Sequence, residues 1–364
     1  MARSWNVIFD PKLDPKYFSS LLSRIDVYTK ILKETPMPPG VREEIDRIGT
    51  VKAIRGTTGI EGNKLEEKDV EELLEAKPAG TPSLEEQEVI NAEAAIMHIR
   101  RLPPTPLASL TEGTIQELHA ITTLECDYRG NKPGVYRRHQ CRAGAYNCPD
   151  YLQVPRLMNR FADYINSRDA LTMHPAVRAV VAHFYLVAIH PFGDGNGRTG
   201  RAVEAYLLFH GGYGHAGFYA LADYYYRHRG EYIEELDESM FENEGSLRNF
   251  VLFGLEGFED ALAARYRLST DYLRKLAYRH YLSELLKEDK INMRIVRVLS
   301  RFADEDIRLS IAQFKERTVP WMADAYKGLT ERSVRHDLTV MRKLELINDH
   351  GGIVRINYRA VESR

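Results

Sequence analysis

Cysteine is scarce in this sequence. Its 364 residues include only Cys126, Cys141 and Cys148. Three cysteines cannot all pair, and a chain of this length can bury a core without disulfides. We therefore expect reduced thiols. We expect no metal at Cys141 and Cys148, because their spacing with the nearby His139 matches no common zinc motif and a fourth ligand is missing.

Long apolar runs are also missing. No stretch of about 18 apolar residues occurs, and no apolar segment follows the basic residue near the N-terminus. These absences argue against a membrane span and a secretory leader, so we expect a cytoplasmic protein with no membrane partner.

The sequence has no large excess of charge of one sign. Lys and Arg number 50 against 52 Asp and Glu, so the whole molecule offers no strong field for nucleic acid, and any such affinity must be local. Repeats and low-complexity tracts are absent, and 44% of residues are hydrophobic. This composition is typical of a globular protein with two or three cores.

Apolar residues recur at helical spacing along most of the chain, between proline-rich breaks that end helices. The pattern predicts helices over 41–53, 68–76, 84–100, 110–124, 154–165, 175–189, 200–209, 232–240 and 248–286. The composition shifts near Lys287. We expect an N-terminal helical region (1–108), a central catalytic domain (109–286) and a C-terminal domain (287–364).

A glycine-dense segment follows the helix predicted over 175–189. It reads His190-Pro-Phe-Gly-Asp-Gly-Asn-Gly-Arg-Thr-Gly-Arg201. Its glycines permit positive φ, so that successive N–H groups can converge on an anion, and the helix that restarts near Arg198 would point its positive end at the loop. Asp194 offers a hard oxygen to Mg²⁺, while Arg198 and Arg201 offer planar forks to phosphate oxygens. His190 has an unperturbed pKa suited to proton transfer near neutral pH.

Two other phosphate motifs fit less well. Gly195-x-Gly197-x-x-Gly200 matches the dinucleotide-binding pattern, but that pattern needs a preceding strand, whereas the residues before it have helical spacing. The P-loop needs Lys followed by Ser or Thr, which this segment does not supply. A plain connector between core helices would need none of its His, Asp, Asn and Arg residues.

This segment resembles the signature of the Fic family, His-x-Phe-x-Asp/Glu-Gly-Asn-Gly-Arg-x-x-Arg, with every fixed position filled. The resemblance extends over roughly 49–272, including Leu118-His119 and Pro133-Gly-Val-Tyr-Arg137. It implies a mainly α fold, a Fic-type helical bundle with a β-hairpin flap. It also implies an enzyme that transfers AMP from ATP, with Mg²⁺, to a protein hydroxyl.

The resemblance assigns a role to each position of the segment. His190 would deprotonate the target hydroxyl, Phe192 would anchor the loop in the core, and Asp194 would hold Mg²⁺. The remaining nucleotide-binding residues would be Gly193, Gly195, Asn196, Gly197, Arg198 for the β-phosphate and Arg201 for the γ-phosphate.

Thr57-Thr-Gly-Ile-Glu61-Gly-Asn63 resembles the inhibitory motif found in part of this family. By itself the pattern is also that of a helix end, with Gly62 or Asn63 as a left-handed cap. Beside the complete catalytic segment, we expect Glu61 to pair with Arg201 and occupy the partner of the γ-phosphate. Thr57 opens the motif. Whether Glu61 also supports removal of AMP stays open.

Two further segments have assignments from the resemblance or from composition. Residues 136–155 lie where the family has its flap, on which a target would dock by strand addition; a hairpin without a role is the alternative. Tyr224 and Tyr232 follow the catalytic helix, and we weigh adenine contacts equally against core packing.

The C-terminal segment 291–364 has 14 Lys and Arg against 10 Asp and Glu. Helical spacing over 291–302, 309–314 and 330–344, followed by a hairpin at Gly351-Gly352, resembles a winged helix-turn-helix domain. Arg332, Arg335, Arg342 and Lys343 could touch DNA phosphates, but the excess is modest, so we favour a protein partner over DNA. A homodimer stays open.

We therefore expect an autoinhibited protein adenylyltransferase acting on Ser, Thr or Tyr. The alternatives are a DNA-binding regulator with a nucleotide-sensing domain, and a related enzyme that uses another donor or removes AMP. An intact His190 favours the enzyme, because a sensor needs phosphate ligands but no base.

Overall fold

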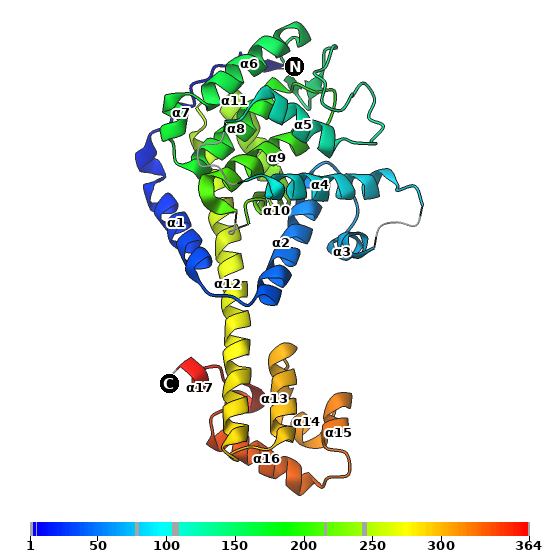
Figure 1. The fold of residues 1–364 in the computed structure, drawn as a ribbon, viewed down its shortest axis with the longest axis vertical. Helices are drawn as coiled ribbons and strands as arrows, with labels where there is room; N and C mark the ends of the chain where they lie inside the picture. Colours follow the sequence, from blue (N-terminus) through cyan, green and yellow to red (C-terminus); the bar gives the residue numbers. More distant parts are fainter. Residues whose placement is uncertain are drawn as a thin grey trace. The chain divides into compact units, whose positions relative to one another are not determined.

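The computed structural model describes residues 3–4, 6–76, 80–103, 109–214, 217–241 and 246–362 (Figure 1). These residues are mainly helical, with short strands of two to four residues. The chain divides into two compact units, Met1–Tyr266 and Arg267–Arg364. Each unit buries a hydrophobic core of its own.

The first unit is a bundle of helices with a small sheet. Its helices are α1 (Ser19–Glu34), α2 (Pro39–Ile60), α3 (Glu67–Glu75), α4 (Leu84–Arg101), α5 (Glu112–Thr122), α6 (Val154–Ile165), α7 (Arg168–Thr172), α8 (Pro175–Ile189), α9 (Asn196–Leu208), α10 (Leu221–Arg227), α11 (Arg229–Phe241) and the first part of α12 (Arg248–Lys287). Single turns lie at η1 (Pro15–Tyr17), η2 (Tyr151–Gln153) and η3 (Phe209–Tyr213).

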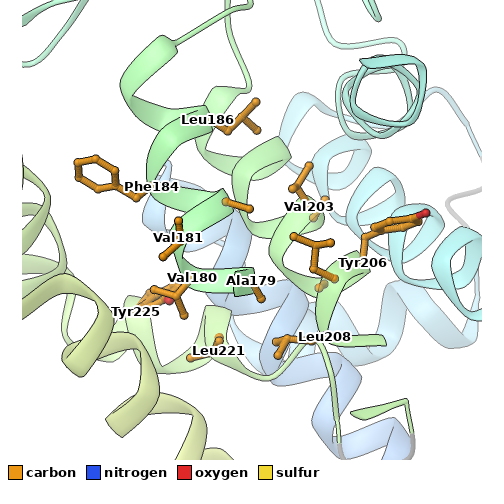
Figure 2. Close-up of a cluster of buried hydrophobic side chains, with 14 of the residues drawn as sticks. Ala179, Val180, Val181, Phe184, Leu186, Val203, Tyr206, Leu208, Leu221 and Tyr225 are labelled. Carbon is orange, nitrogen blue, oxygen red and sulfur yellow. The ribbon is translucent and has the colours of Figure 1, made fainter. Parts of the chain in front are cut away.

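Helix α8 lies in the centre of the first core. Val181 and Phe184 are fully buried, and Val180 nearly so, because α8 is apolar on all sides and must be surrounded by other elements. Figure 2 shows side chains of α8, α9 and α10 meeting in this core. The central position of α8 gives a firm support to the loop that follows it.

The expected helical bundle is confirmed, and several helices have the predicted limits within a residue. Helix α2 is longer than predicted, however, and continues to Ile60, so Thr57 is helical and Glu61 follows directly. Helix α9 begins at Asn196, earlier than predicted, because Gly195 caps it with a left-handed backbone, φ 72°. Helices α1 and α10 are separate elements that the sequence pattern did not single out.

The expected flap contains a hairpin much shorter than 136–155. Strands β2 (Arg142–Ala143) and β3 (Tyr146–Asn147) pair antiparallel, with Arg142 opposite Asn147. Strand β1 (Arg3–Ser4) pairs in parallel with the other side of β3, giving the order β1-β3-β2. Among the described residues, β1 and β2 are therefore the two edges of this sheet, and β3 is its central strand.

The second unit contains the last part of α12 and a small helical domain. Its elements are α13 (Met293–Asp304), β4 (Leu309–Ser310), α14 (Ile311–Glu316), α15 (Pro320–Ala325), α16 (Glu331–Lys343), β5 (Ile347–Asn348), the turn η4 (His350–Gly352), β6 (Ile353–Ile356) and α17 (Arg359–Glu362). The antiparallel sheet has the order β4-β6-β5. Val298 of α13 and Leu338 of α16 are buried in its core.

The division between the units falls inside α12, earlier than the boundary expected near Lys287. The physical reason is packing. Tyr278, Leu282 and Leu285 of α12 are buried in the second core, whereas Phe250 and Phe258 of the same helix are buried in the first. The N-terminal helices also share the first core with the segment expected as a separate catalytic domain.

Among the described residues, no helix is both long and apolar enough to cross a membrane.

Candidate active site

His190 ends helix α8 with an unusual backbone. Its φ of 51° and ψ of 57° lie in the left-handed region, which glycine or asparagine normally occupies at a helix end. A histidine in this position costs free energy, and such strain concentrates at functional sites. The turn is held by the His190 N–H, which donates to the Leu186 carbonyl at 2.9 Å.

The imidazole of His190 is oriented by the helix that carries it. Its Nδ1 lies 3.2 Å from the Val187 carbonyl, so Nδ1 carries the proton and donates, which leaves the lone pair on Nε2. Burial lowers the pKa of His190 to about 4. The ring is therefore neutral near pH 7 and able to accept a proton.

Phe192 anchors the loop in the core, as the resemblance implies. It is fully buried and stacks on the ring of His119, with centroids 3.6 Å apart and planes within 2°. His119 Nδ1 accepts from the Gly134 N–H at 2.9 Å, so its Nε2 is the protonated nitrogen and donates to the Asp194 carbonyl at 3.1 Å. His119 thus joins the flap entry to the catalytic loop.

Asn196 has a different role from the one expected for its side chain. The amide donates to the Phe192 carbonyl at 3.0 Å and accepts from the Phe192 N–H at 2.9 Å. It is 2% exposed. The side chain therefore braces the loop, and it is the backbone N–H groups at the start of α9 that remain for an anion.

Two of the loop glycines are required by close packing. A Cβ at Gly193 would lie 2.3 Å from the Gly130 carbonyl oxygen, and one at Gly197 would lie 2.4 Å from Glu61 Oε1. Gly193 therefore serves the packing of the loop against the segment before the flap. Gly197 leaves room for an acidic group directly over the start of α9, the position that an anion would take.

Arg198 lies buried below the loop, 5% exposed. Its Nη1 donates to Glu88 Oε1 at 3.0 Å and to the Tyr128 hydroxyl, and its Nη2 donates to Asp194 Oδ1 at 3.2 Å. Glu88 on α4 and Tyr128 are contacts that the sequence reasoning missed, since both lie far from the glycine-rich segment in the chain. They hold the guanidinium in place.

Asp194 is the residue best suited to a hard cation. Its side chain is 48% exposed, and the bonds from the Gly195 N–H and from Arg198 both go to Oδ1. The second carboxylate oxygen makes no hydrogen bond among the described residues. A partly exposed carboxylate beside an anion site fits Mg²⁺, which retains several waters and shares phosphate oxygens.

Arg201 is held by both residues expected to inhibit. Its Nη2 donates to Glu61 Oε1 at 2.6 Å and to the Thr57 carbonyl at 3.0 Å, while Nε donates to the Thr57 hydroxyl at 2.8 Å. Burial would raise the pKa of Glu61, but the charge and hydrogen bond of Arg201 outweigh it and lower this pKa below its ordinary value. Glu61 is therefore a carboxylate at neutral pH.

The end of α2 places Glu61 at this point. Gly62 adopts φ 100°, so the helix-cap interpretation and the ion-pair interpretation of the motif both hold. Asn63 is buried and donates to Glu88 Oε2 at 2.8 Å and to the Glu85 carbonyl at 3.0 Å. Asn63 thereby fastens the end of α2 to α4.

The comparison with protein families agrees with this geometry. The Fic/DOC family model matches residues 109–208, which include α8, the loop and α9. This chain contains a Fic/DOC family domain.

Curated relatives and solved structures extend the comparison. The chain is 30% identical over 243 residues to the protein adenylyltransferases Fic of Aedes aegypti and Culex quinquefasciatus, covering 66% of this chain and 46% of each relative. This chain thus spans about half the length of these relatives.

A solved structure of a Fic family protein from Desulfovibrio desulfuricans G20 is similar over 95% of this chain and 98% of its own, with a TM-score of 0.59 and 20% identity. Fic-1 from C. elegans covers 69% of this chain and 73% of its own, with a TM-score of 0.55 and 24% identity. These likenesses show the Fic fold.

The two tyrosines weighed equally between adenine contacts and core packing both pack in or against the hydrophobic core of the first unit. Tyr232 is 4% exposed, and its hydroxyl lies 3.0 Å from His183 Nε2. Tyr224 packs its ring on His228 and Phe253. The structure therefore favours core packing for the buried Tyr232, while Tyr224 is partly buried and packs against the core.

Arg137 ties the flap to the catalytic loop. It is 4% exposed and donates through Nε to the His190 carbonyl at 2.8 Å and through Nη2 to the Pro149 carbonyl at 2.6 Å. Tyr146 of β3 donates to the Ala188 carbonyl of α8 at 2.9 Å. The flap is thus fastened beside His190, and the only sequence signal for Arg137 was its place in the flap-entry motif.

Proposed function

We propose that this chain is an autoinhibited protein adenylyltransferase, which transfers AMP from ATP to a Ser, Thr or Tyr hydroxyl of a target protein and releases pyrophosphate. The main support is the position of a neutral His190 with its Nε2 lone pair available, on the same loop as the anion site at the start of α9. The names of the curated relatives, protein adenylyltransferase Fic, support the choice of reaction.

In the proposed reaction, Nε2 of His190 accepts the proton of the target hydroxyl. The hydroxyl oxygen forms a bond to the α-phosphorus, the bond from this phosphorus to the bridging oxygen breaks, and pyrophosphate leaves with the electron pair. The N–H groups at the start of α9 and the guanidinium of Arg198 bind the phosphate oxygens, and Arg201 binds the γ-phosphate once it is free. Most of the acceleration comes from in-line positioning and charge neutralisation.

Asp194 would hold Mg²⁺, which when bound neutralises phosphate charge. The partly exposed carboxylate described above fits this role, and the Nη2 of Arg198 keeps Oδ1 in place. Asp194 and Arg198 would thus act on the same polyphosphate from two sides.

Autoinhibition follows from competition for Arg201. Glu61 Oε1 lies where an anionic oxygen of the nucleotide would need to approach the guanidinium, and it also lies over Gly197. ATP can still reach Arg198, but its γ-phosphate lacks its partner, so the α-phosphate is misaligned for attack. The wild-type chain therefore rests in a low-activity state.

The test compares Glu61→Gly with the wild type after incubation with ATP and Mg²⁺, read by intact-mass spectrometry. Glu61→Gly is expected to gain the mass of AMP, by self-modification, much faster than the wild type. His190→Asn in the Glu61→Gly background is the control, because asparagine tolerates the left-handed backbone of His190 but cannot act as the base. Labelling equal to that of the wild type, or labelling that survives His190→Asn, would contradict the proposal. Parallel incubations with other nucleotides identify the donor.

We also propose that the target docks along β2, the edge strand of the flap hairpin, by adding a strand. A photo-cross-linking side chain in place of the exposed Arg142 is expected to capture the modified protein. Capture only from positions outside the flap would contradict this docking.

For the second unit we propose a protein partner in preference to DNA. Two of its four candidate phosphate contacts are already in ion pairs, Arg335 with Glu331 and Arg342 with Asp349.

A further inference from the structure

Two cysteines of the flap lie opposite each other and beside His190. Strand register places Arg142 opposite Asn147, so the next pair outward is Cys141 and Cys148. One ligand atom from each of Cys141, Cys148 and His190 can be chosen so that all three lie within 4.8 Å of one another. Cys148 is 3% exposed, while Cys141 and His190 are half-buried.

The surroundings of His190 suit a ligand as well as a base. Because its Nδ1–H donates to the Val187 carbonyl, the ring presents Nε2 with a free lone pair. Histidines that bind metals usually donate their other ring N–H to a carbonyl or a carboxylate, which fixes the tautomer and the ring orientation. This second contact is present before any ion binds.

We infer that Cys141, Cys148 and His190 form a binding site for a soft divalent cation of the zinc class, with two sulfurs, one nitrogen and an open fourth position. Two thiolates and an imidazole are ligands that zinc prefers, and a three-ligand site with an open position is one of its common forms. Each thiol releases its proton to solvent as the ion binds. Ligands about 2.3 Å from zinc lie roughly 3.7 Å apart, so a small closure of the hairpin suffices.

The third ligand is not the histidine that the sequence suggested. His139 lies next to the cysteines in the chain, whereas His190 comes from the end of α8 and meets them only because Arg137 and Tyr146 fasten the flap there. Two thiolates and one divalent ion leave the set of ligands and ion neutral. This site is separate from Asp194, whose oxygen ligand suits a hard cation.

The consequence for activity rests on the proposed function. A bound ion occupies the Nε2 lone pair, so His190 cannot accept the proton of a target hydroxyl. The enzyme would then have a second inactive state, with the ion bound at the flap, that does not involve Glu61. Removal of the ion by a chelator would restore the base.

The experiment uses the full chain, reduced and freed of metal, titrated with Co²⁺ as a spectroscopic probe for zinc. We expect about one equivalent to bind with a thiolate-to-cobalt charge-transfer band, which zinc then abolishes by displacement. Cys141→Ser, a substitution at a half-exposed position, should lose most of this band while its metal-free unfolding midpoint stays near that of the wild type. His190→Asn should weaken binding by more than about tenfold, because even outer partners of a ligand are worth that much.

Two matched variants separate this site from others. Cys126→Ser should keep the band, since Cys126 is buried next to Asn91 and away from the flap. Asp194→Ala should also keep it, since an oxygen ligand gives no thiolate band. The inference is overturned if the reduced wild type shows no band, if Cys141→Ser leaves the band unchanged, or if the thiols are recovered as a Cys141–Cys148 disulfide that excludes the ion. An inactive Glu61→Gly variant with an intact cobalt band would count against the proposed reaction alone.

Discussion

At the scale of single residues, the site depends on which partners its charged groups have. The guanidinium of Arg198 is bound to Glu88, Tyr128 and Asp194, which fix its position. Arg201 is instead bound by Glu61 and Thr57, and its Nη1 is buried with no hydrogen-bond partner among the described residues. The two arginines of one motif therefore have different partners, and under the proposed function the partners of Arg201 are the inhibitory ones.

The Glu61 ion pair predicts a pH dependence of stability. Because the folded-state pKa of Glu61 is lowered, the pair stabilises the fold above the unfolded-state pKa, and this contribution is lost as the pH falls through the folded-state pKa. The advantage of the wild type over Glu61→Gln should be about 1 kcal/mol or less at neutral pH, since the carboxylate is 35% exposed. It should shrink in acid, as measured by urea unfolding at several pH values.

A matched variant checks that the effect comes from the pair. Glu43 lies on an exposed face of α2, the helix that ends just before Glu61, and makes no ion pair among the described residues. Glu43→Gln should differ from the wild type by an amount that does not change over this range. A difference for Glu61→Gln that grows in acid would contradict the expected direction.

Individual residues also mark the limits of sequence reasoning. Twelve consecutive residues predicted an anion site, and in the structure Phe192 is buried and Arg201 pairs with Glu61. The motif could not reveal that the Asn196 amide closes on the Phe192 backbone, nor that His119 stacks beneath it. The first is a contact of a side chain with the backbone inside the loop, the second is a stacking of two rings with a residue outside the motif, and the motif encodes neither.

At the scale of elements, helix α2 brings the Glu61 carboxylate to Arg201 because it packs very closely on α10. A Cβ at Gly56 would lie 2.5 Å from the Ala222 carbonyl oxygen. Glycine is unfavourable inside a helix, and residues 54–60 of α2 include two glycines and two threonines, so the helix propensity of this stretch is low. Packing overrides that propensity, which is why the sequence pattern ended this helix too early.

The packing predicts the effect of one methyl group. Gly56→Ala should push α2 away from α10 and lower the free energy of unfolding by about 1–3 kcal/mol, as overpacked cores do. It should also loosen Glu61 and raise the basal self-modification. Urea unfolding and intact-mass labelling would measure the two effects.

Gly40→Ala is the control on the same helix, because a Cβ at Gly40 meets nothing within 4 Å. It should leave both quantities near those of the wild type. Equal stability of Gly56→Ala and Gly40→Ala would show that the contact between α2 and α10 is not as close as the structure has it.

At the scale of the whole molecule, the chain combines a first unit, which contains the Fic/DOC family domain, with a second unit that has its own core. The shift in composition near Lys287 predicted a domain boundary there, but the two units divide earlier, after Tyr266. The reason is that α12 supplies buried residues to both cores. Periodicity shows that a helix is amphipathic, whereas only contacts show which core each of its turns enters.

The second unit predicts weak binding of DNA by the full chain. Arg335 and Arg342 are in ion pairs, whereas Arg332 and Lys343 make none among the described residues. We expect little retardation of random duplex DNA at physiological salt, and a shallow salt dependence that reflects few phosphate contacts. Tight binding that falls steeply with salt and is lost in Arg332→Gln would favour a DNA-binding regulator.

The sequence by itself determined the helical character, the anion-binding loop and the residues available for proton transfer and phosphate binding, because these depend on local periodicity and on residues adjacent in the chain. The tertiary structure alone decided which distant groups meet there. It brought Glu61 from the end of α2 onto Arg201, and Glu88 onto Arg198. It placed the flap cysteines beside His190, buried Tyr232 in the core and packed the partly buried Tyr224 against it. The reason is that such contacts depend on how helices pack, and packing is set by side chains far apart in the chain.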